Sequence, residues 1–249
     1  MRGLGARGGQ QRMNLALNRA GMGYAEHGIM KTHLAFIRRA VVAFTLLELV
    51  ITVGVLVLIA ALLLPALAKS THTGCRINCA NNLKQVGLSF RLWAGDNGEK
   101  FPMQVAVTNG GSLESVATGL VAPHFAVISN ELGTPKIVAC PDDKERKSAT
   151  DFGLLRDTNV GYFICLSATA ESAPDTWLAG DRNITNRFAP TRGVLYLSTN
   201  SPVGWSDETH KQQGNLVFID GSVQQPSSTK LRDYLRSQTN SPLRLAMPE

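Results

Sequence analysis

A long apolar run near the start of the chain dominates the pattern of hydrophobic and polar positions. Between Ala40 and Ala68 the sequence holds one ionisable side chain, Glu48. Because an α-helix rises about 1.5 Å per residue, about 20 apolar residues cross the roughly 30 Å hydrocarbon core of a membrane. The apolar region of a secretory signal peptide is shorter, at about 7–15 residues. The run therefore predicts a membrane-spanning helix over residues 44–68.

After residue 68 the apolar positions recur with the period of a helix. They fall at spacings of 4, 3, 4 and 3, on Cys79, Leu83, Val86, Phe90 and Trp93. Polar residues fill the other faces, and the segment Gly95-Asp96-Asn97-Gly98 supplies a stop signal. We expect residues 69–95 to continue the same helix as an amphipathic segment, whose apolar stripe packs on a globular domain.

Residues 96–249 alternate short apolar runs with turn residues, which is typical of a mixed domain. The runs predict strands at residues 137–140, 161–166, 176–179, 194–198, 216–219 and 222–225, and helices at 124–132 and 228–236, the last after an N-capping Ser. Asp220 and Gly221 separate two of the runs and predict a two-residue hairpin turn. We expect an α+β fold, in which the long helix packs on a mainly antiparallel β-sheet.

Charge is distributed unevenly along the chain. The formal net charge is +6, and residues 1–43 account for all of it, with seven Lys or Arg and one Glu. Residues 44–249 hold 18 basic and 18 acidic side chains, so nucleic acid is not an expected partner. Lys31, Arg38 and Arg39 precede the apolar run and favour a cytoplasmic N-terminus.

The residues at the start of the apolar run carry a family resemblance. The segment Ala43-Phe44-Thr45-Leu46-Leu47-Glu48 follows a basic stretch and leads directly into the apolar helix. Here the chain resembles the type IV prepilin and type II secretion pseudopilin superfamily, in which Gly usually stands at the position of Ala43. The resemblance implies that a prepilin peptidase removes residues 1–43 and that the new amine of Phe44 is methylated. Family leaders are short, so we expect the true start at Met30.

Glu48 has a physical role under this resemblance. A carboxylate within an apolar span costs roughly 2.5–3.5 kcal/mol on insertion scales, so such a group tends to be paired or functional. The resemblance implies that the Phe44 ammonium is its partner, within one helix or between neighbouring subunits, and that the pair guides assembly. The alternative is that Glu48 lies near the membrane surface and reaches headgroup water. Pro65 marks either a bent or locally melted part of the family's helix or a simple kink at the membrane exit.

Two later segments narrow the resemblance to a large bacterial group of pseudopilin-like proteins. These are Cys140-Pro141-Asp142 and the His-x9-Asp-Gly segment that joins His210 to Asp220-Gly221. The group implies a pilin-like fold and a structural subunit of a type II secretion-like system, with a single inner-membrane span and a periplasmic domain. The implied partners are the prepilin peptidase, other pseudopilin subunits and the inner-membrane platform of the secretion system. Two alternatives stay open: a minor pilin of a type IV pilus or competence system, and a membrane-anchored periplasmic binding or enzymatic domain.

The four cysteines are Cys75, Cys79, Cys140 and Cys165. Disulfides are expected in an oxidising periplasm. Cys75 and Cys79 lie four residues apart on one helix, which is awkward for a direct bond. A bridge from either of them to Cys140 is therefore favoured, and free buried thiols are the alternative. Zinc is disfavoured, because no closely spaced pair of ligands stands opposite a second such pair.

Candidate catalytic residues are few. The chain contains neither Gly-x-Ser-x-Gly nor His-Glu-x-x-His, and no nucleophile is marked for His210, so we expect no enzyme activity. The role of His210 stays open, whereas the hairpin accounts for Asp220 and Gly221. Major pseudopilins often hold calcium in a C-terminal loop, which makes Asp181 and Asn183 candidate ligands. Turn chemistry explains that loop without an ion, so no cofactor is expected apart from this calcium alternative.

Overall fold

The computed structural model describes residues 45–238 and 242–248, and over residues 65–73 it describes the backbone without the side chains. The expected cleavage site at Ala43 and Phe44, and the expected start at Met30, lie outside the described residues. The chain divides into two units between residues 49 and 50, and the second unit contains the whole globular domain.

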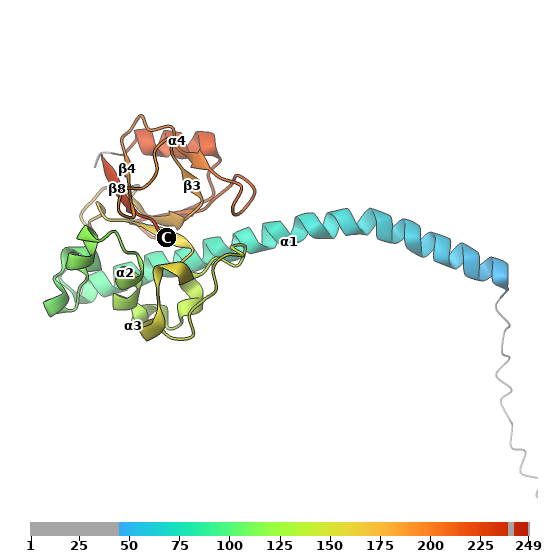
Figure 1. Ribbon diagram of the computed structural model, residues 1–249, viewed down its shortest axis with the longest axis horizontal. Coiled ribbons are helices and arrows are strands. Elements are labelled where there is room, and N and C mark those ends of the chain that lie inside the picture. Colours follow the sequence, from blue (N-terminus) through green and yellow to red (C-terminus); the bar gives the residue numbers. More distant parts are fainter. Residues whose placement is uncertain (1–44, 239–241, 249) are drawn as a thin grey trace, which may run out of the picture. The chain divides into compact units, whose positions relative to one another are not determined.

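Helix α1 extends from Leu46 to Asp96, over 51 residues (Figure 1). Its section Leu46–Leu64 is long and apolar enough, by length and composition, to cross a membrane, and all of its side chains are exposed. The helical backbone continues through Pro65, whose side chain lies outside the described residues. The predicted apolar stripe is confirmed, because every one of its side chains is buried. After the helix, Gly98 adopts a left-handed conformation, as the stop signal predicted.

An antiparallel sheet of six strands forms the centre of the globular domain, in the order β4-β8-β1-β2-β6-β7. The strands are Tyr162–Cys165 for β1, Trp177–Asp181 for β2, Val194–Leu197 for β4, Leu216–Phe218 for β6, Val223–Gln224 for β7 and Leu243–Ala246 for β8. Strands β3 (Ile184–Thr185) and β5 (Gly204–Trp205) form a separate antiparallel pair. The α+β class and the mainly antiparallel sheet are thus confirmed.

Short helices and turns connect these strands. The α-helices are α2 (Ala122–Val127), α3 (Ser129–Leu132) and α4 (Ser228–Arg236). The 3-10 turns are Pro102–Gln104, Val107–Asn109, Leu113–Ala117, Pro135–Val138, Phe152–Leu154 and Asp157–Asn159. Helix α4 begins as predicted, because the Ser227 hydroxyl accepts a hydrogen bond from the Lys230 backbone N–H. The single helix predicted over residues 124–132 is instead two, since the backbone leaves the helical conformation at Ile128.

The strand predicted at residues 137–140 is wrong. The chain forms a 3-10 turn over Pro135–Val138 there. Proline fixes its own φ near the helical value, and the Thr134 hydroxyl accepts a hydrogen bond from the Lys136 backbone N–H at 3.4 Å. These two local preferences outweigh the strand tendency of the apolar residues that follow.

The predicted hairpin between β6 and β7 is present, but its loop has three residues rather than two. The Phe218 N–H donates to the Ser222 carbonyl at 2.9 Å, which leaves residues 219–221 as the loop. Gly221 has φ 81°, the left-handed conformation that the last position of such a loop requires. The hairpin packs closely on α1, because a Cβ added to Gly87 would lie only 2.7 Å from Val217 Cγ2.

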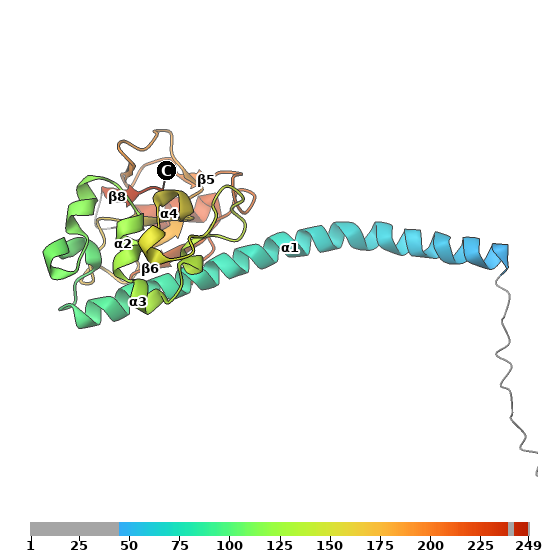
Figure 2. The ribbon, with the colours of Figure 1, turned by 60° about the horizontal axis from the view of Figure 1, so that its bottom comes forward.

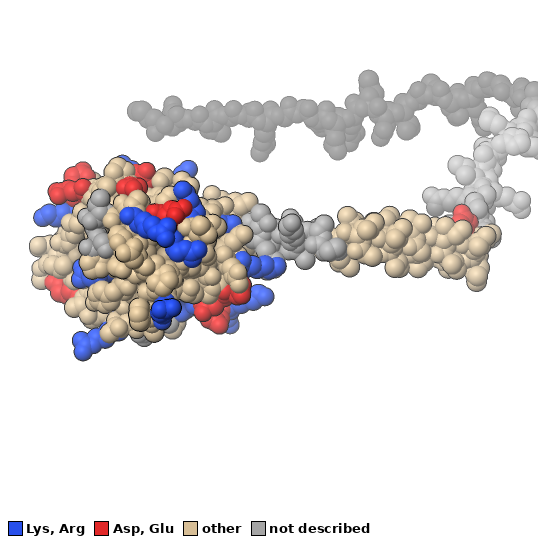
Figure 3. Space-filling view, turned by 90° about the horizontal axis from the view of Figure 1, so that it is seen from above, with Lys and Arg blue, Asp and Glu red and all other residues tan. Residues whose placement is uncertain are grey.

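The core lies between the sheet, the C-terminal section of α1 and the helices beside it. Both ribbon views place α2 and α3 next to this section of α1 (Figures 1 and 2). Phe90 of α1 makes edge-to-face contacts with Phe101 and Phe125, at ring-centre distances of 5.8 and 6.3 Å. Charged side chains spread over the globular domain, whereas Leu46–Leu64 carries a single charge at Glu48 (Figure 3).

Candidate functional site

The first candidate residue, Glu48, lies in the first turn of α1. Its side chain is exposed, and its backbone N–H donates to the Thr45 hydroxyl at 3.2 Å. Thr45 therefore stabilises the start of the helix, as Ser or Thr does three residues before Glu at many helix starts. The described residues bury no part of the section Leu46–Leu64.

The second candidate is a buried polar cluster formed by Cys79, Cys140, Asp181 and His210. Each residue offers one sulfur, nitrogen or oxygen atom, and the four atoms lie within 4.8 Å of one another. The imidazole of His210 is central, since its Nε2 lies 3.3 Å from Cys140 Sγ and 3.4 Å from Asp181 Oδ2. Its Nδ1 lies 3.2 Å from Asp142 Oδ2, and the same carboxylate oxygen accepts a hydrogen bond from the His210 backbone N–H at 2.8 Å.

Four separate elements bring the cluster together. Cys79 lies on α1, Cys140 follows a 3-10 turn, Asp181 ends β2, and His210 lies in the loop between β5 and β6. Arg182 connects three of these segments, because its guanidinium pairs with Asp143 at 2.5 Å and with Glu208 at 2.9 Å. Hydrogen bonding to Asp143 raises the Arg182 pKa, so this link stays charged.

The loop that carries His210 is held in a costly conformation. His210, Lys211 and Gln212 have φ values of 54°, 50° and 59°, a left-handed run without glycine. Each such residue costs on the order of 1–2 kcal/mol. The Asn183 side-chain nitrogen offsets this cost by hydrogen-bonding the carbonyls of Ser206, Thr209 and Gln213. The chain thus spends conformational energy to hold this histidine in place, which points to a role for it.

Burial controls the charges in the cluster. It raises the pKa of Asp181 to about 7, against the opposing effect of hydrogen bonds from the Asn215 backbone and side-chain N–H groups. Both of these bonds go to Oδ2, and Oδ1 has no hydrogen-bond partner among the described residues. Burial also lowers the pKa of His210, while Asp142 acts in the opposite direction. Burial therefore favours the neutral forms of Asp181 and His210, and Asp181 Oδ1 is a buried oxygen without a hydrogen-bond partner among the described residues.

The structure joins Cys79 and Cys140 in a disulfide with a Cα–Cα distance of 5.4 Å, one of the two bridges favoured from the sequence. It links α1 to the segment that precedes β1. Cys75 and Cys165 are free. Burial raises the pKa of the Cys165 thiol to about 11, so this side chain is unreactive.

The calcium alternative stays a prediction. Asn183 uses its side-chain nitrogen to hold the histidine loop, and Asp181 Oδ1 and Asn183 Oδ1 are buried oxygens without a hydrogen-bond partner among the described residues. The Asp181 carboxylate also faces sulfur and imidazole, which are not calcium ligands. The His-x9-Asp-Gly segment also divides: His210 is buried in the cluster, whereas Asp220 and Gly221 form the hairpin loop. The sequence had no local signal that would bring His210 to Cys140, because 70 residues separate them.

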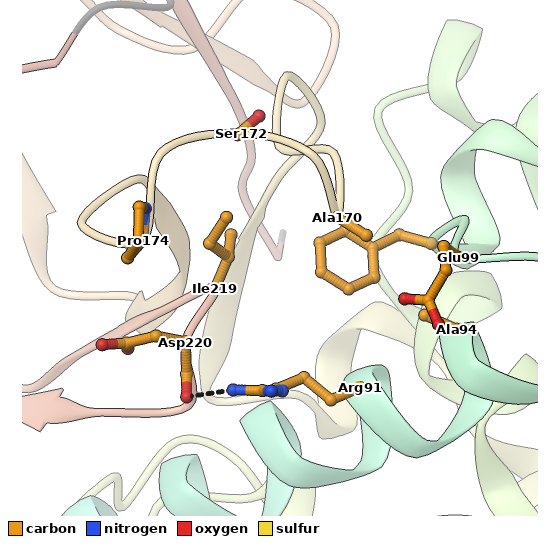
Figure 4. Close-up of a pocket in the computed structure, with 9 residues that line it drawn as sticks. Arg91, Ala94, Glu99, Ala170, Ser172, Pro174, Ile219 and Asp220 are labelled. Carbon is orange, nitrogen blue, oxygen red and sulfur yellow. Dashed lines mark hydrogen bonds between the residues drawn. The ribbon is translucent and has the colours of Figure 1, made fainter.

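A surface pocket of about 380 Å³ lies between α1, the hairpin loop and residues 170–174 (Figure 4). Arg91 points toward the hairpin, where its guanidinium donates to the Asp220 carbonyl at 2.5 Å. Glu99 and Asp220 contribute carboxylates on opposite sides, and the residues that line the pocket include Ser172 but no histidine. The Ser172 hydroxyl lies 2.8 Å from the Thr169 hydroxyl rather than beside a base, and Arg91 attaches the hairpin to α1.

No protein-family model matches this chain, and comparisons with curated proteins and with solved structures find no match.

Proposed function

We propose that this protein is a pilin-like structural subunit that assembles through the apolar section of α1 into the periplasmic pseudopilus of a type II secretion-like system. One observation carries the proposal: Leu46–Leu64 is an exposed apolar helix surface with Glu48 as its single charge. An apolar surface of this length is stable in a lipid bilayer or in a bundle of like helices. A subunit that leaves the lipid bilayer and enters a bundle of like helices keeps this apolar surface out of water in both environments.

Glu48 supplies the selectivity in this proposal. A lone carboxylate in an apolar medium costs roughly 2.5–3.5 kcal/mol, so a cation at the same depth stabilises the assembled state. Removal of residues 1–43 by a prepilin peptidase creates that cation at the Phe44 amine, four residues before Glu48. Pairing between the amine of one subunit and the carboxylate of the next fixes their axial offset. Repeated contacts of this head-to-tail kind form an open filament rather than a closed ring.

The packed section of α1 supports the same function. Its buried stripe attaches the antiparallel domain to the helix, so the domain moves with the helix as one subunit. The disulfide suits an oxidising compartment and therefore a periplasmic domain on a single-pass inner-membrane anchor. The proposed partners are the prepilin peptidase, other pseudopilin subunits and the inner-membrane platform. A minor pilin of a type IV pilus or competence system shares these features, and identification of the copurifying subunits distinguishes the two systems.

The direct test is the intact mass and N-terminal sequence of the protein extracted from membranes. We expect a chain that begins at Phe44 and carries one added methyl group. A chain that keeps the basic segment, or that begins at another residue, would contradict the proposal.

A matched pair of variants tests the role of Glu48. Glu48→Gln removes the charge that the Phe44 amine would pair with, whereas Glu171→Gln removes an exposed charge from the globular domain. We expect Glu48→Gln to lose cross-linking into filaments while its domain unfolds normally, and Glu171→Gln to assemble like the wild type. Equal assembly of both variants would favour the alternative of a membrane-anchored binding or enzymatic domain.

A further inference from the structure

The buried cluster has the donor set of a tetrahedral metal site. A zinc ion bonds to sulfur at about 2.3 Å and to nitrogen or oxygen at about 2.0–2.2 Å, so its ligand atoms lie roughly 3.3–3.8 Å apart. The distances from His210 Nε2 to Cys140 Sγ and to Asp181 Oδ2 are 3.3 and 3.4 Å. Cys79 completes a set of four ligand atoms that all lie within 4.8 Å of one another.

We propose that the thiol form of this chain binds a zinc-class divalent metal ion at Cys79, Cys140, Asp181 and His210, and that formation of the Cys79–Cys140 disulfide releases the ion. A structural disulfide on its own requires neither an imidazole nor a carboxylate beside it. Here both are buried. Asp181 Oδ1 has no hydrogen-bond partner among the described residues, whereas Oδ2, the oxygen 3.4 Å from His210 Nε2, accepts both bonds from Asn215. A metal ion bound to the two thiolates and to this carboxylate would give Oδ1 a positively charged neighbour.

The surrounding residues orient the ligands as they do in metal proteins. Asp142 Oδ2 lies 3.2 Å from Nδ1 of His210 and accepts a hydrogen bond from the His210 backbone N–H at 2.8 Å, on the side of the ring away from Nε2 and Cys140 Sγ. Asn215 donates two hydrogen bonds to Asp181 and fixes the carboxylate. Two thiolates, one imidazole and one carboxylate favour zinc over calcium or magnesium, which take oxygen ligands. Because each ligand comes from a different element, the spacing rule that disfavoured zinc in the sequence does not apply.

The two sulfurs of Cys79 and Cys140 exchange a covalent bond for a shared metal ion. A dithiol reductant gives two electrons and two protons to the Cys79–Cys140 bond, breaks it into two thiols and becomes a disulfide itself. The metal ion then displaces the two thiol protons when it binds. In the reverse direction, a small-molecule disulfide accepts two electrons from the two thiolates and two protons from water, its S–S bond breaks to give two thiols, the two protein sulfurs bond to each other and the ion leaves. Both the metal-bound form and the disulfide form link α1 to the segment before β1, so this link is kept in reducing and in oxidising surroundings.

Cobalt binding to the full chain in detergent tests the site. The protein is reduced with dithiothreitol, freed of reductant without air, and titrated with Co²⁺, which gives strong visible absorption when four-coordinate with thiolates. We expect one cobalt per reduced chain, displacement by zinc, and none in the disulfide form. A reduced wild-type chain that shows no four-coordinate cobalt overturns the proposal.

Variants locate the ligands. His210→Gln and Asp181→Asn should each weaken cobalt binding more than tenfold, and Asp142→Asn by about 10–100-fold, as outer partners of metal ligands do. Cys75→Ser is the matched control, since Cys75 lies on the same helix but outside the cluster, and it should bind like the wild type. Each variant is first checked in its disulfide form by circular dichroism, so that loss of binding is separated from loss of fold. Unchanged binding by both ligand variants would assign the cobalt to other thiols and refute the site.

Discussion

The two sections of helix α1 both carry large apolar side chains, but in opposite surroundings. Leu58 in the apolar section is 62% exposed, whereas Leu83 in the packed section is 0% exposed. The packed section finds its partners inside the chain, in the sheet and in α2. The apolar section finds none among the described residues, and its side chains are exposed. One continuous helix thus connects a section that is packed inside the domain with a section whose apolar side chains are exposed.

The two sections also carry different chemical groups. The apolar section holds one carboxylate, Glu48, and the packed section holds Cys79 with its link to Cys140. Glu48 has an exposed side chain, whereas the sulfur of Cys79 lies among buried polar groups of the domain. Substitutions that act on one section and spare the other test this distinction.

The largest contrast is expected from one substitution made in both sections. Leu83→Ala removes a fully buried side chain and should lower the free energy of unfolding by about 2–5 kcal/mol. Leu58→Ala should change it by no more than about 0.5 kcal/mol, because that side chain is outside the domain core. Urea unfolding of the full chain in detergent, followed by tryptophan fluorescence, measures both. Similar losses for the two variants would mean that the apolar section is part of the domain core.

The disulfide should give the next largest effect. It spans a sequence separation of 61 residues, and closing a loop of that size stabilises the folded state by roughly 4 kcal/mol in the chain-entropy model. We expect the Cys79→Ser/Cys140→Ser double variant to lose about 2–4 kcal/mol in metal-free urea unfolding, compared with the oxidised wild type. Cys75→Ser, on the same helix, should unfold like the wild type. A double variant of unchanged stability would show that the packed section needs no covalent link.

His124 of α2, behind the packed section, should make the domain sensitive to acid. Burial lowers its pKa from 6.5 to about 4, so the folded state holds the neutral form while the unfolded chain takes up a proton. Stability should therefore fall as pH drops from about 6.5 to about 4, by up to roughly 3 kcal/mol for this group.

The variant His124→Asn isolates this effect, because an amide can still hydrogen-bond to the Ser112 hydroxyl. Asp181 has a pKa raised to about 7 and contributes the opposite slope, since its stabilising neutral form is lost as pH rises from about 4 to about 7. The informative quantity is thus the difference between wild type and variant, measured by urea unfolding across this pH range. A constant difference would exclude His124 as the acid-sensitive group.

Local patterns predicted much of the fold and little of the buried site. The helical stripe on α1, most strands of the sheet and the Ser227 cap of α4 each depend on residues close in sequence. Strands β3 and β5 were missed because each has only two residues and, unlike the equally short β7, neither follows a predicted hairpin turn. Strand β8 was missed because Arg244 interrupts a short apolar run.

The buried site depends on contacts between distant segments. The sequence contained Cys140, Asp181 and His210 as separate candidates, but hydrophobic periodicity reports one element at a time. Their meeting point is set by the sheet order, in which β2 lies between β1 and β6. The position of His210 against the sulfur of Cys140 therefore follows from the fold and not from any local pattern.

The smallest expected effect on unfolding comes from adding a single methyl group to a glycine in each section of α1. At Gly87 an added Cβ would lie 2.7 Å from Val217 Cγ2 and 3.3 Å from the Gly221 backbone, so Gly87→Ala must push the hairpin away from α1. Overpacking of this kind costs about 1–3 kcal/mol, and the better helix propensity of alanine returns roughly 1 kcal/mol. At Gly54 nothing lies within 4 Å, so Gly54→Ala should leave domain unfolding unchanged. If Gly87→Ala stabilised the domain in urea unfolding, the close contact between the hairpin and the packed section would not be a constraint on this fold.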